Sequence, residues 1–244
     1  MSALYVGNPA LPNILQEGLF FSKDNAISIK TAYQRDWVFN IDMKAVSNVS
    51  GSIDDFTNFS DQGVILVNLF NHISLYGSIG AMRIYASHIP RAGVQNMYQT
   101  DNQLTWGIGG RVFFASWQNV LFGFDAKYQR ATPSIKWMTQ NGTPFTPNNR
   151  SSIDFNQWQI GLGASYQISI FYPYLSVKYL NAKSFFNHLP AHFFSNTNHF
   201  KTSNRKKFGI AIGTTISTGS IFDLSIEAQL IDQEALTLTG EIRF

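Results

Sequence analysis

The chain has 244 residues, of which 44% are hydrophobic and only 14% are charged. Soluble domains carry about 25% charged residues, so this composition is unusual for one. No apolar run approaches the roughly 18 residues of a spanning helix, which excludes helical membrane insertion. The net charge of +3 is too small and too dispersed to indicate a nucleic-acid partner, and the lack of cysteine excludes disulfides and thiolate chemistry.

Residues 1–25 show no strand pattern and contain Gly7, Pro9, Pro12 and Gly18. We interpret them as an irregular leader, which lies either in the periplasm or inside the lumen of a β-barrel formed by the rest of the chain. The first residues have neither the basic nor the apolar region of a secretory signal. We therefore expect the sequence to be a mature form from which the export signal has been removed.

Apolar and polar side chains alternate from Ile27 to Ile41, which predicts a strand with one apolar face. We interpret this segment as one long strand that projects past the membrane; a hairpin at Arg35–Asp36 is the alternative. The next stretch, Val46 to Gln62, is rich in Ser, Asn, Asp and Gly, and we predict a long loop there.

The same alternation recurs along the rest of the chain and brings the total to about ten strands, with twelve as the alternative. The further predicted strands are 63–70, 73–87, 104–116, 120–129, 157–168, 172–180, 208–216, 222–230 and 236–244. Short turns at 71–72, 117–119, 169–171 and 217–220 alternate with long loops at 46–62, 89–103, 137–150 and 186–203. This rhythm is typical of outer-membrane barrels, which have short periplasmic turns and long outer loops.

The last two strands alternate strictly, and the second runs to the final residue, Phe244. A closed barrel pairs such a terminal strand on both edges, and we expect it to pair with the first strand near Ile27 to Tyr33. We also expect Phe244 to act as a barrel-assembly signal for the insertion machinery. Aromatic residues near strand ends predict interfacial girdles: Trp106, Phe114, Tyr128, Trp158, Tyr166, Tyr179 and Phe244. A closing hairpin of a soluble β-sandwich explains the alternation but not these girdles or the loop asymmetry. Residues 26–244 are therefore predicted to form an all-β, antiparallel transmembrane barrel in a bacterial outer membrane.

Several segments resemble the chlamydial major outer-membrane porin family, in the same order along the chain. They are Val6-Gly7-Asn8-Pro9-Ala10, Trp106–Arg111, Ser152–Trp158, Phe171-Tyr-Pro-Tyr174, Gly209–Thr215, Glu227–Asp232 and the terminal Arg243-Phe244. The resemblance implies an outer-membrane porin that forms trimers or other homo-oligomers. Members of that family are cysteine-rich, cross-linked and longer, whereas this chain is short and has no cysteine. Disulfide-linked assembly is therefore not expected.

The polar face of the predicted strands is the candidate functional surface. By parity its charged members are Lys30, Arg111, Asp125, Lys127, Lys178, Lys207, Asp223, Glu227, Glu241 and Arg243. Ten strands leave a lumen of roughly 10 Å, enough for ions and small hydrophilic solutes if nothing plugs it. Six bases against four acids predict weak anion preference. Alternatively the charges pair across strands and fill the lumen, which would make the chain a plugged structural or adhesin barrel.

An outer-membrane hydrolase is the alternative from a different class, because His188, His192 and His199 share one predicted loop. His188 and His192 have the spacing of a metal pair, but only a helix would put both on one face, and Pro190 lies between them. Solvated loop histidines are the favoured interpretation. No catalytic residue, metal or cofactor is predicted, and the expected partners are outer-membrane lipid, the insertion machinery and small solutes.

Overall fold

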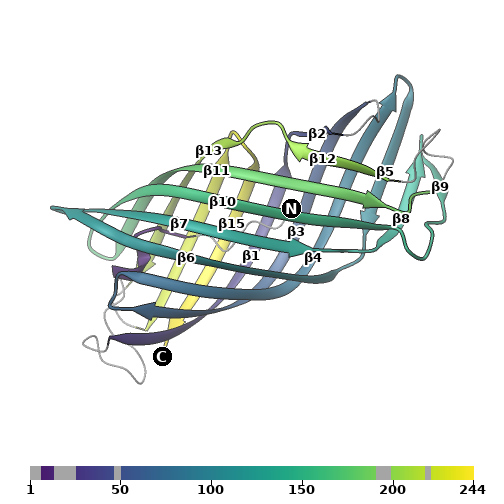
Figure 1. The fold of residues 1–244 in the computed structure, drawn as a ribbon. Helices are drawn as coiled ribbons and strands as arrows, with labels where there is room; N and C mark the ends of the chain where they lie inside the picture. Colours follow the sequence, from purple (N-terminus) through teal and green to yellow (C-terminus); the bar gives the residue numbers. More distant parts are fainter. Residues whose placement is uncertain (1–6, 14–25, 47–50, 191–198, 218–220) are drawn as a thin grey trace.

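The chain folds into one β-barrel, and a computed structural model describes residues 7–13, 26–46, 51–190, 199–217 and 221–244 (Figure 1). Within these residues the only helical element is the single 3-10 turn η1 (Leu11–Asn13). No helix in this part of the chain is long and apolar enough to span a membrane. All strand pairings are antiparallel, and the ladder is continuous from β3 through β1 around to β4 and back to β3.

Ten strands form this closed ring, as the alternation predicts. In ring order they are β3 (Ser52–Leu69), β1 (Ile27–Asn40), β15 (Glu234–Arg243), β14 (Phe222–Leu230), β13 (Phe208–Ser217), β11 (Phe171–Asn187), β10 (Ser152–Tyr166), β7 (Val120–Ala131), β6 (Gln103–Trp117) and β4 (Ile73–Arg91). The first strand is unbroken at Arg35–Asp36, so the alternative hairpin does not form.

The two ends of the barrel sequence close the ring, as predicted. In the β1–β15 pair, Lys30 lies opposite Arg243 and Tyr33 lies opposite Gly240. The ladder continues to the last residue, where the backbone amide of Phe244 donates to the carbonyl of Ile29 at 2.9 Å. Closure satisfies the backbone groups of both terminal strands, which an exposed sheet edge would leave unpaired.

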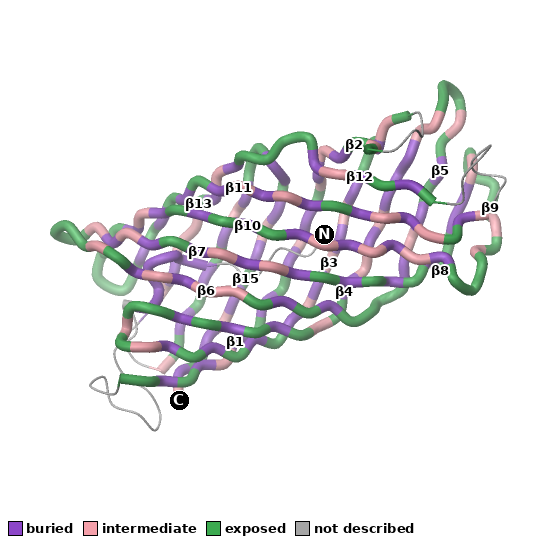
Figure 2. Tube along the Cα trace, viewed as in Figure 1, coloured by how far each residue is buried: buried purple, intermediate pink, exposed green. Residues whose placement is uncertain are grey.

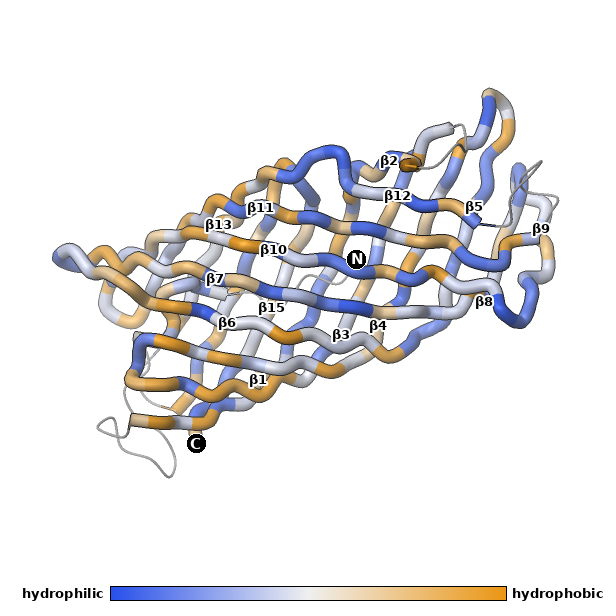
Figure 3. The backbone as a smooth tube through the Cα atoms, viewed as in Figure 1, coloured by the Kyte–Doolittle hydropathy of each residue, from blue (hydrophilic) through white to orange (hydrophobic). Residues whose placement is uncertain are grey.

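Buried and exposed positions alternate along the strands (Figure 2), and hydrophilic and hydrophobic positions alternate with them along β7, β10 and β11 (Figure 3). The outward-facing residues Ile160, Leu162, Ile212 and Leu224 are exposed, as expected for a lipid-facing surface. The alternation placed Ile41 on the apolar outer face, and this is wrong. Ile41 follows the end of β1 and is buried inside the barrel.

Aromatic side chains form two belts on the outside of the barrel. The outer belt is continuous over five strands: Trp106, Tyr128, Trp158, Tyr179 and Phe208, with neighbouring ring centroids 5.2–5.7 Å apart where they touch. The belt near the short turns contains Phe70, Phe114, Trp117, Tyr166, Phe171 and Phe222. From Trp158 to Tyr166 the strand covers roughly 26 Å, which a tilt of about 40° reduces to roughly 20 Å of membrane thickness. We refer to the part of the barrel between the belts as the spanning section.

Two of the four predicted long loops, 46–62 and 89–103, are largely strands in the described residues, and this corrects the sequence interpretation. β3 already begins at Ser52, and β4 runs on to Arg91. The additional strands are β2 (Met43–Ala45), β5 (Val94–Thr100), β8 (Ile135–Gln140), β9 (Thr143–Phe145) and β12 (Phe200–Asn204). In β3 the polar residues Asn58, Ser60 and Gln62 face inward and are buried, so composition alone made this strand look like a loop. The outward-facing Thr57 and Asp61 are polar as well, because they lie beyond the lipid, so the hydrophobic half of the period-two signal is lost.

The additional strands extend the barrel outward beyond the outer belt. β12 pairs with β11 and β2, and β2 pairs in turn with β3, so this ladder bridges the barrel above the shorter strands β13, β14 and β15. On the other side β5 pairs with β4 and with β8. We refer to this part of the barrel as the outer section.

Candidate functional site: the barrel interior

Charged side chains on the inner face of the spanning section are buried, and several of them form ion pairs. Glu241 on β15 lies 3.6 Å from Arg111 and 3.9 Å from Lys30, and all three side chains are about 1% exposed. Arg111 comes from β6, so this contact crosses the interior from one wall to another. Two more buried ion pairs, Lys127–Asp125 and Lys178–Asp232, each have a separation of 3.2 Å.

The structure places nine of the ten predicted lumen charges inside the barrel, each at most 6% exposed: Lys30, Arg111, Asp125, Lys127, Lys178, Asp223, Glu227, Glu241 and Arg243. Lys207 is the exception and corrects the prediction. It is exposed, and its ammonium lies 5.9 Å from the ring centroid of Tyr179 on the outer surface. Lys207 precedes β13 in the connection from β12, where strand alternation does not apply.

Sequence reasoning missed two buried carboxylates, Asp36 and Asp232. Asp36 follows the inward phase of β1, so parity alone would have found it. Asp232 lies in the connection between β14 and β15, where parity carries no information, and it faces inward because it pairs with Lys178.

A band of polar side chains, centred on the buried Asp36, crosses the interior near the outer belt. The carboxylate of Asp36 accepts hydrogen bonds from Gln34, Ser60 and Thr237 at 2.8–2.9 Å. Gln129 on β7 donates to Gln62 on β3 at 3.3 Å, although two strands of the ring separate them. Polar groups that meet each other across the barrel occupy space that an open pore would fill with water.

The described part of the leader, Gly7–Asn13, lies inside the half of the barrel nearer the short turns. Asn8 donates from Nδ2 to Oγ of Ser165 at 2.7 Å, and Asn68 donates to the carbonyl of Pro12 at 3.3 Å. Leu11 is 2% exposed and belongs to an apolar cluster with Phe113, Leu121 and Tyr172.

Inner-face glycines make room for this leader. A Cβ atom on Gly163 would approach Cγ of Pro9 to 2.9 Å, and one on Gly123 would collide with the backbone of Pro9. Other inner glycines face bulky side chains instead: Gly213 lies against the ring of Tyr174 and Gly109 against that of Tyr76. The lumen glycines therefore accommodate packed atoms and do not widen an open channel.

Beyond the polar band, the interior of the outer section is mostly apolar. It holds a cluster of twenty buried hydrophobic residues, each at most 6% exposed, among them Phe56, Tyr98, Phe155, Phe186 and Phe200. The rings of Phe186 and Phe200 stack with centroids 4.3 Å apart. Burial raises the pKa of the Tyr98 phenol above its ordinary value, in keeping with a dry environment. The inside of the outer section is thus mostly apolar, whereas that of the spanning section is mostly polar, and the apolar cluster closes the barrel on that side.

The histidines of the hydrolase alternative do not assemble into a site in the described residues. His188 and His199 are exposed, and His192 lies outside the described residues. The carboxylates that could have partnered these histidines form ion pairs instead. Asp154 lies 2.9 Å from Arg130, and Asp101 lies 3.7 Å from Lys136. Among residues 7–13, 26–46, 51–190, 199–217 and 221–244, no group of three or more His, Asp or Glu side chains has a metal-binding arrangement.

These features define the class of protein: the chain is a β-barrel protein of the bacterial outer membrane. No family model matches it. It is 21% identical to the major outer membrane porin of Chlamydia abortus, over 370 aligned positions that cover 100% of this chain and 95% of that protein. The serovar F porin of Chlamydia trachomatis, also 21% identical, and a Chlamydia pneumoniae porin, 20% identical, show the same coverage. The similarity noted in the motifs therefore extends over the full length.

These porins are longer than this chain, whose 244 residues spread over 370 aligned positions, so about a third of those positions are gaps here. Two solved barrels show limited structural likeness. The outer membrane protease OmpT of Escherichia coli has a TM-score of 0.42 at 12% identity and covers 89% of this chain and 95% of its own. The outer membrane protein OprG of Pseudomonas aeruginosa has a TM-score of 0.40 at 9% identity, with 94% and 99% coverage.

Proposed function

We propose that the chain is an outer-membrane channel for ions and small hydrophilic solutes, and that the described conformation is its closed state. The observation that carries this proposal is the inner face of the spanning section, where buried charged and polar side chains outnumber the apolar ones of two small clusters. Such a face suits water and solutes. The full-length similarity to proteins named major outer membrane porin supports the same function, and no enzymatic activity is proposed.

Passage through this barrel requires the Glu241–Arg111 contact and the polar band to part, and two larger obstructions to move. The first is Gly7–Asn13, a short segment held by a few polar contacts and one small apolar cluster. The second is the apolar core of the outer section, which is much larger. Because both lie on the same path, removing one alone leaves the other in place.

Planar-bilayer recordings test the channel. The full chain should give small, infrequent conductance steps, since both obstructions are present. Deletion of residues 7–13 should lengthen the openings, and combining it with Phe155→Ala and Phe186→Ala should enlarge the steps. The lack of any step in the combined variant, from protein that circular dichroism shows to be a folded barrel, would refute the channel.

The selectivity expected from the sequence changes once the charges are placed. With Lys207 outside and with Asp36 and Asp232 inside, the described residues place five buried bases and six buried acids in the interior. We therefore propose weak selectivity without the anion preference that the parity count suggested. Reversal potentials close to zero in a salt gradient would support this, and their size should fall further as salt screens the charges.

A sealed structural barrel is the second candidate, and the apolar core of the outer section favours it specifically. In that case the interior contacts would hold the barrel rigid, and the outer section would be the functional surface. The same recordings distinguish the two candidates. A homo-oligomer, trimeric by analogy with the resemblance, is proposed for either one, and the mass of the detergent-solubilised protein tests it.

A further inference from the structure

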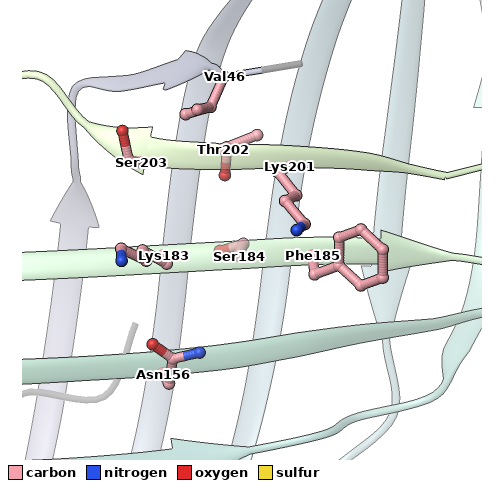
Figure 4. Close-up of a pocket in the computed structure, with 8 residues that line it drawn as sticks. All are labelled: Val46, Asn156, Lys183, Ser184, Phe185, Lys201, Thr202 and Ser203. Atoms are coloured by element: carbon pink, nitrogen blue, oxygen red, sulfur yellow. The ribbon is translucent and has the colours of Figure 1, made fainter.

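A pocket of about 350 Å³ opens on the outside of the barrel, away from the interior site (Figure 4). It lies on β10, β11 and β12 and on the residue that follows β2. The lining residues that face outward are Val46, Asn156, Lys183, Phe185, Lys201 and Ser203. The pocket plays no part in the proposed channel, because these side chains are on the other face of the wall from the lumen.

The strand register arranges these side chains in two rows. Asn156, Lys183 and Ser203 are successive cross-strand neighbours on β10, β11 and β12. In the next row outward, Phe185 lies opposite Lys201. The ammonium of Lys201 is 5.3 Å from the ring centroid of Phe185, and Figure 4 shows it directed toward that ring. The pocket thus combines two cations, an amide, a hydroxyl and an aromatic ring.

The local charge balance is positive. Lys183 and Lys201 are both exposed, and Lys44 lies opposite Ser203 at the edge of the pocket. Carboxylates on neighbouring elements are paired with arginines: Asp154 with Arg130 at 2.9 Å and Asp42 with Arg205 at 3.4 Å. Asp54 and Asp55 lie one strand further away, on β3. An anionic ligand is therefore the complementary one.

The height of the pocket above the membrane indicates which anion can reach it. Lys183 follows the belt residue Tyr179 by four positions on β11, about 13 Å along the strand and about 10 Å along the membrane normal. The headgroup layer extends roughly 5–7 Å beyond the hydrocarbon. Lysine stems of several ångströms let the ammonium groups reach back into this layer. Lys183 therefore stands at the level of lipid headgroup phosphates, and Lys201, opposite Phe185 two positions further along β11, stands about 5 Å higher.

We propose that this pocket binds the phosphorylated headgroup of an outer-leaflet glycolipid. Lys183 and Lys201 contact the phosphate, Asn156 and Ser203 hydrogen-bond to sugar hydroxyls, and the ring of Phe185 packs against the apolar face of the sugar. The acyl chains then run down the outside of the spanning section, past Tyr179 and Trp158. A point charge on a flexible stem suits a phosphate whose position varies with the membrane.

The test uses the full chain in detergent micelles, titrated with bis-phosphorylated lipid A and followed by native mass spectrometry. The double variant Lys183→Gln/Lys201→Gln should bind about 25-fold more weakly, from about fivefold per lysine removed near a lipid surface. The double variant Lys183→Arg/Lys201→Arg should bind within a few-fold of wild type. Both lysines are exposed, so the variants should fold, and heat-modifiable migration on gels checks that they do.

Three controls make the result specific. Arg91→Gln/Arg150→Gln removes two exposed positive charges elsewhere on the outer section, and its affinity should stay within about twofold. Lipid A stripped of its phosphates should bind as weakly as the lysine variant. Millimolar inorganic phosphate should not displace the lipid. Equal binding of dephosphorylated lipid A, equal loss in the arginine control, or displacement by phosphate alone would each overturn the proposal.

Discussion

Glu241 links two bases of the barrel interior, and its contribution to stability depends on whether that interior is filled or open to water. It is the shared partner of Arg111 and Lys30, and all three side chains are about 1% exposed. Removing one partner from a buried ion pair costs about 3–5 kcal/mol, because the remaining charge stays buried without compensation, whereas an exposed pair is worth about 1 kcal/mol or less.

Glu241→Gln should therefore lower the free energy of unfolding by about 3–5 kcal/mol, measured by urea titration in lipid vesicles. Asp154→Asn is the matched control, because Asp154 pairs with Arg130, whose side chain is 48% exposed. That variant should lose about 1 kcal/mol or less. If the free energy of unfolding fell by the same small amount in both variants, the lumen would be hydrated and the interior contacts would be weak.

Ile212 tests the lipid-facing assignment at the same scale. It is 49% exposed near the middle of β13, so Ile212→Lys should cost about 2–4 kcal/mol in the same titration. Leu104→Lys is the control, since Leu104 lies beyond the belt residue Trp106 on β6, where the cost falls to about 0–1 kcal/mol. Gly213 is unsuitable as a lumen control because any side chain there meets the ring of Tyr174. Equal costs at 212 and 104 would contradict the membrane position.

Among the elements, β15 has the most specific role because it closes the ring against β1 and ends on Phe244. Phe244→Ala keeps the backbone bond to Ile29 and removes only the aromatic side chain. If that side chain is an assembly signal, the amount of folded protein in the outer membrane should fall several-fold, while refolding of the purified chain into lipid stays nearly unchanged.

Trp117→Ala is the control for this variant. Trp117 is also an aromatic of the belt near the short turns and is 70% exposed, but it lies on an internal hairpin. Heat-modifiable protein on gels of membrane fractions measures both variants. An equal reduction in the two would mean that Phe244 acts only as one more belt residue.

On the scale of the whole molecule, the barrel changes polarity along its axis. Between the belts it is apolar outside and mostly polar inside; in the outer section, beyond the polar band, the inside is mostly apolar. The outer section thus has the pattern of a soluble β-structure continued from a membrane barrel. Its stability comes from water exclusion by the inner cluster, and not from contact with lipid.

This polarity change predicts slow hydrogen exchange in a segment whose composition resembles a loop. Residues 52–62 pair with β4 throughout and partly with β1, so their amides should be protected to a similar degree as those of β10. The exposed Asn148–Arg150, which precede β10, serve as the fast-exchanging reference within the same experiment. Exchange of 52–62 at the rate of that reference would show that the outer section is not folded in solution.

The amino-acid sequence by itself determined the class of fold, the strand number and the closure of β1 on β15. Period-two alternation is a local property, and it is strongest where lipid on one side and polar atoms on the other impose opposite demands on successive residues. For the same reason it placed Lys30, Asp125, Glu241 and Arg243 on the inner face.

Only the tertiary structure decided what fills that inner face. Whether Arg111 meets Glu241 across the barrel, or whether Pro9 fits against Gly163, depends on barrel diameter and on residues far apart in sequence. The tertiary structure also decided that 52–62 and 94–100 are strands. Contacts inside the barrel, and not lipid, determine which side chains suit their inward-facing positions. The exposed position of Lys207 was also decided by the tertiary structure. Alternation applies only within a strand, and pairing with β11 makes β13 begin at Phe208, after Lys207.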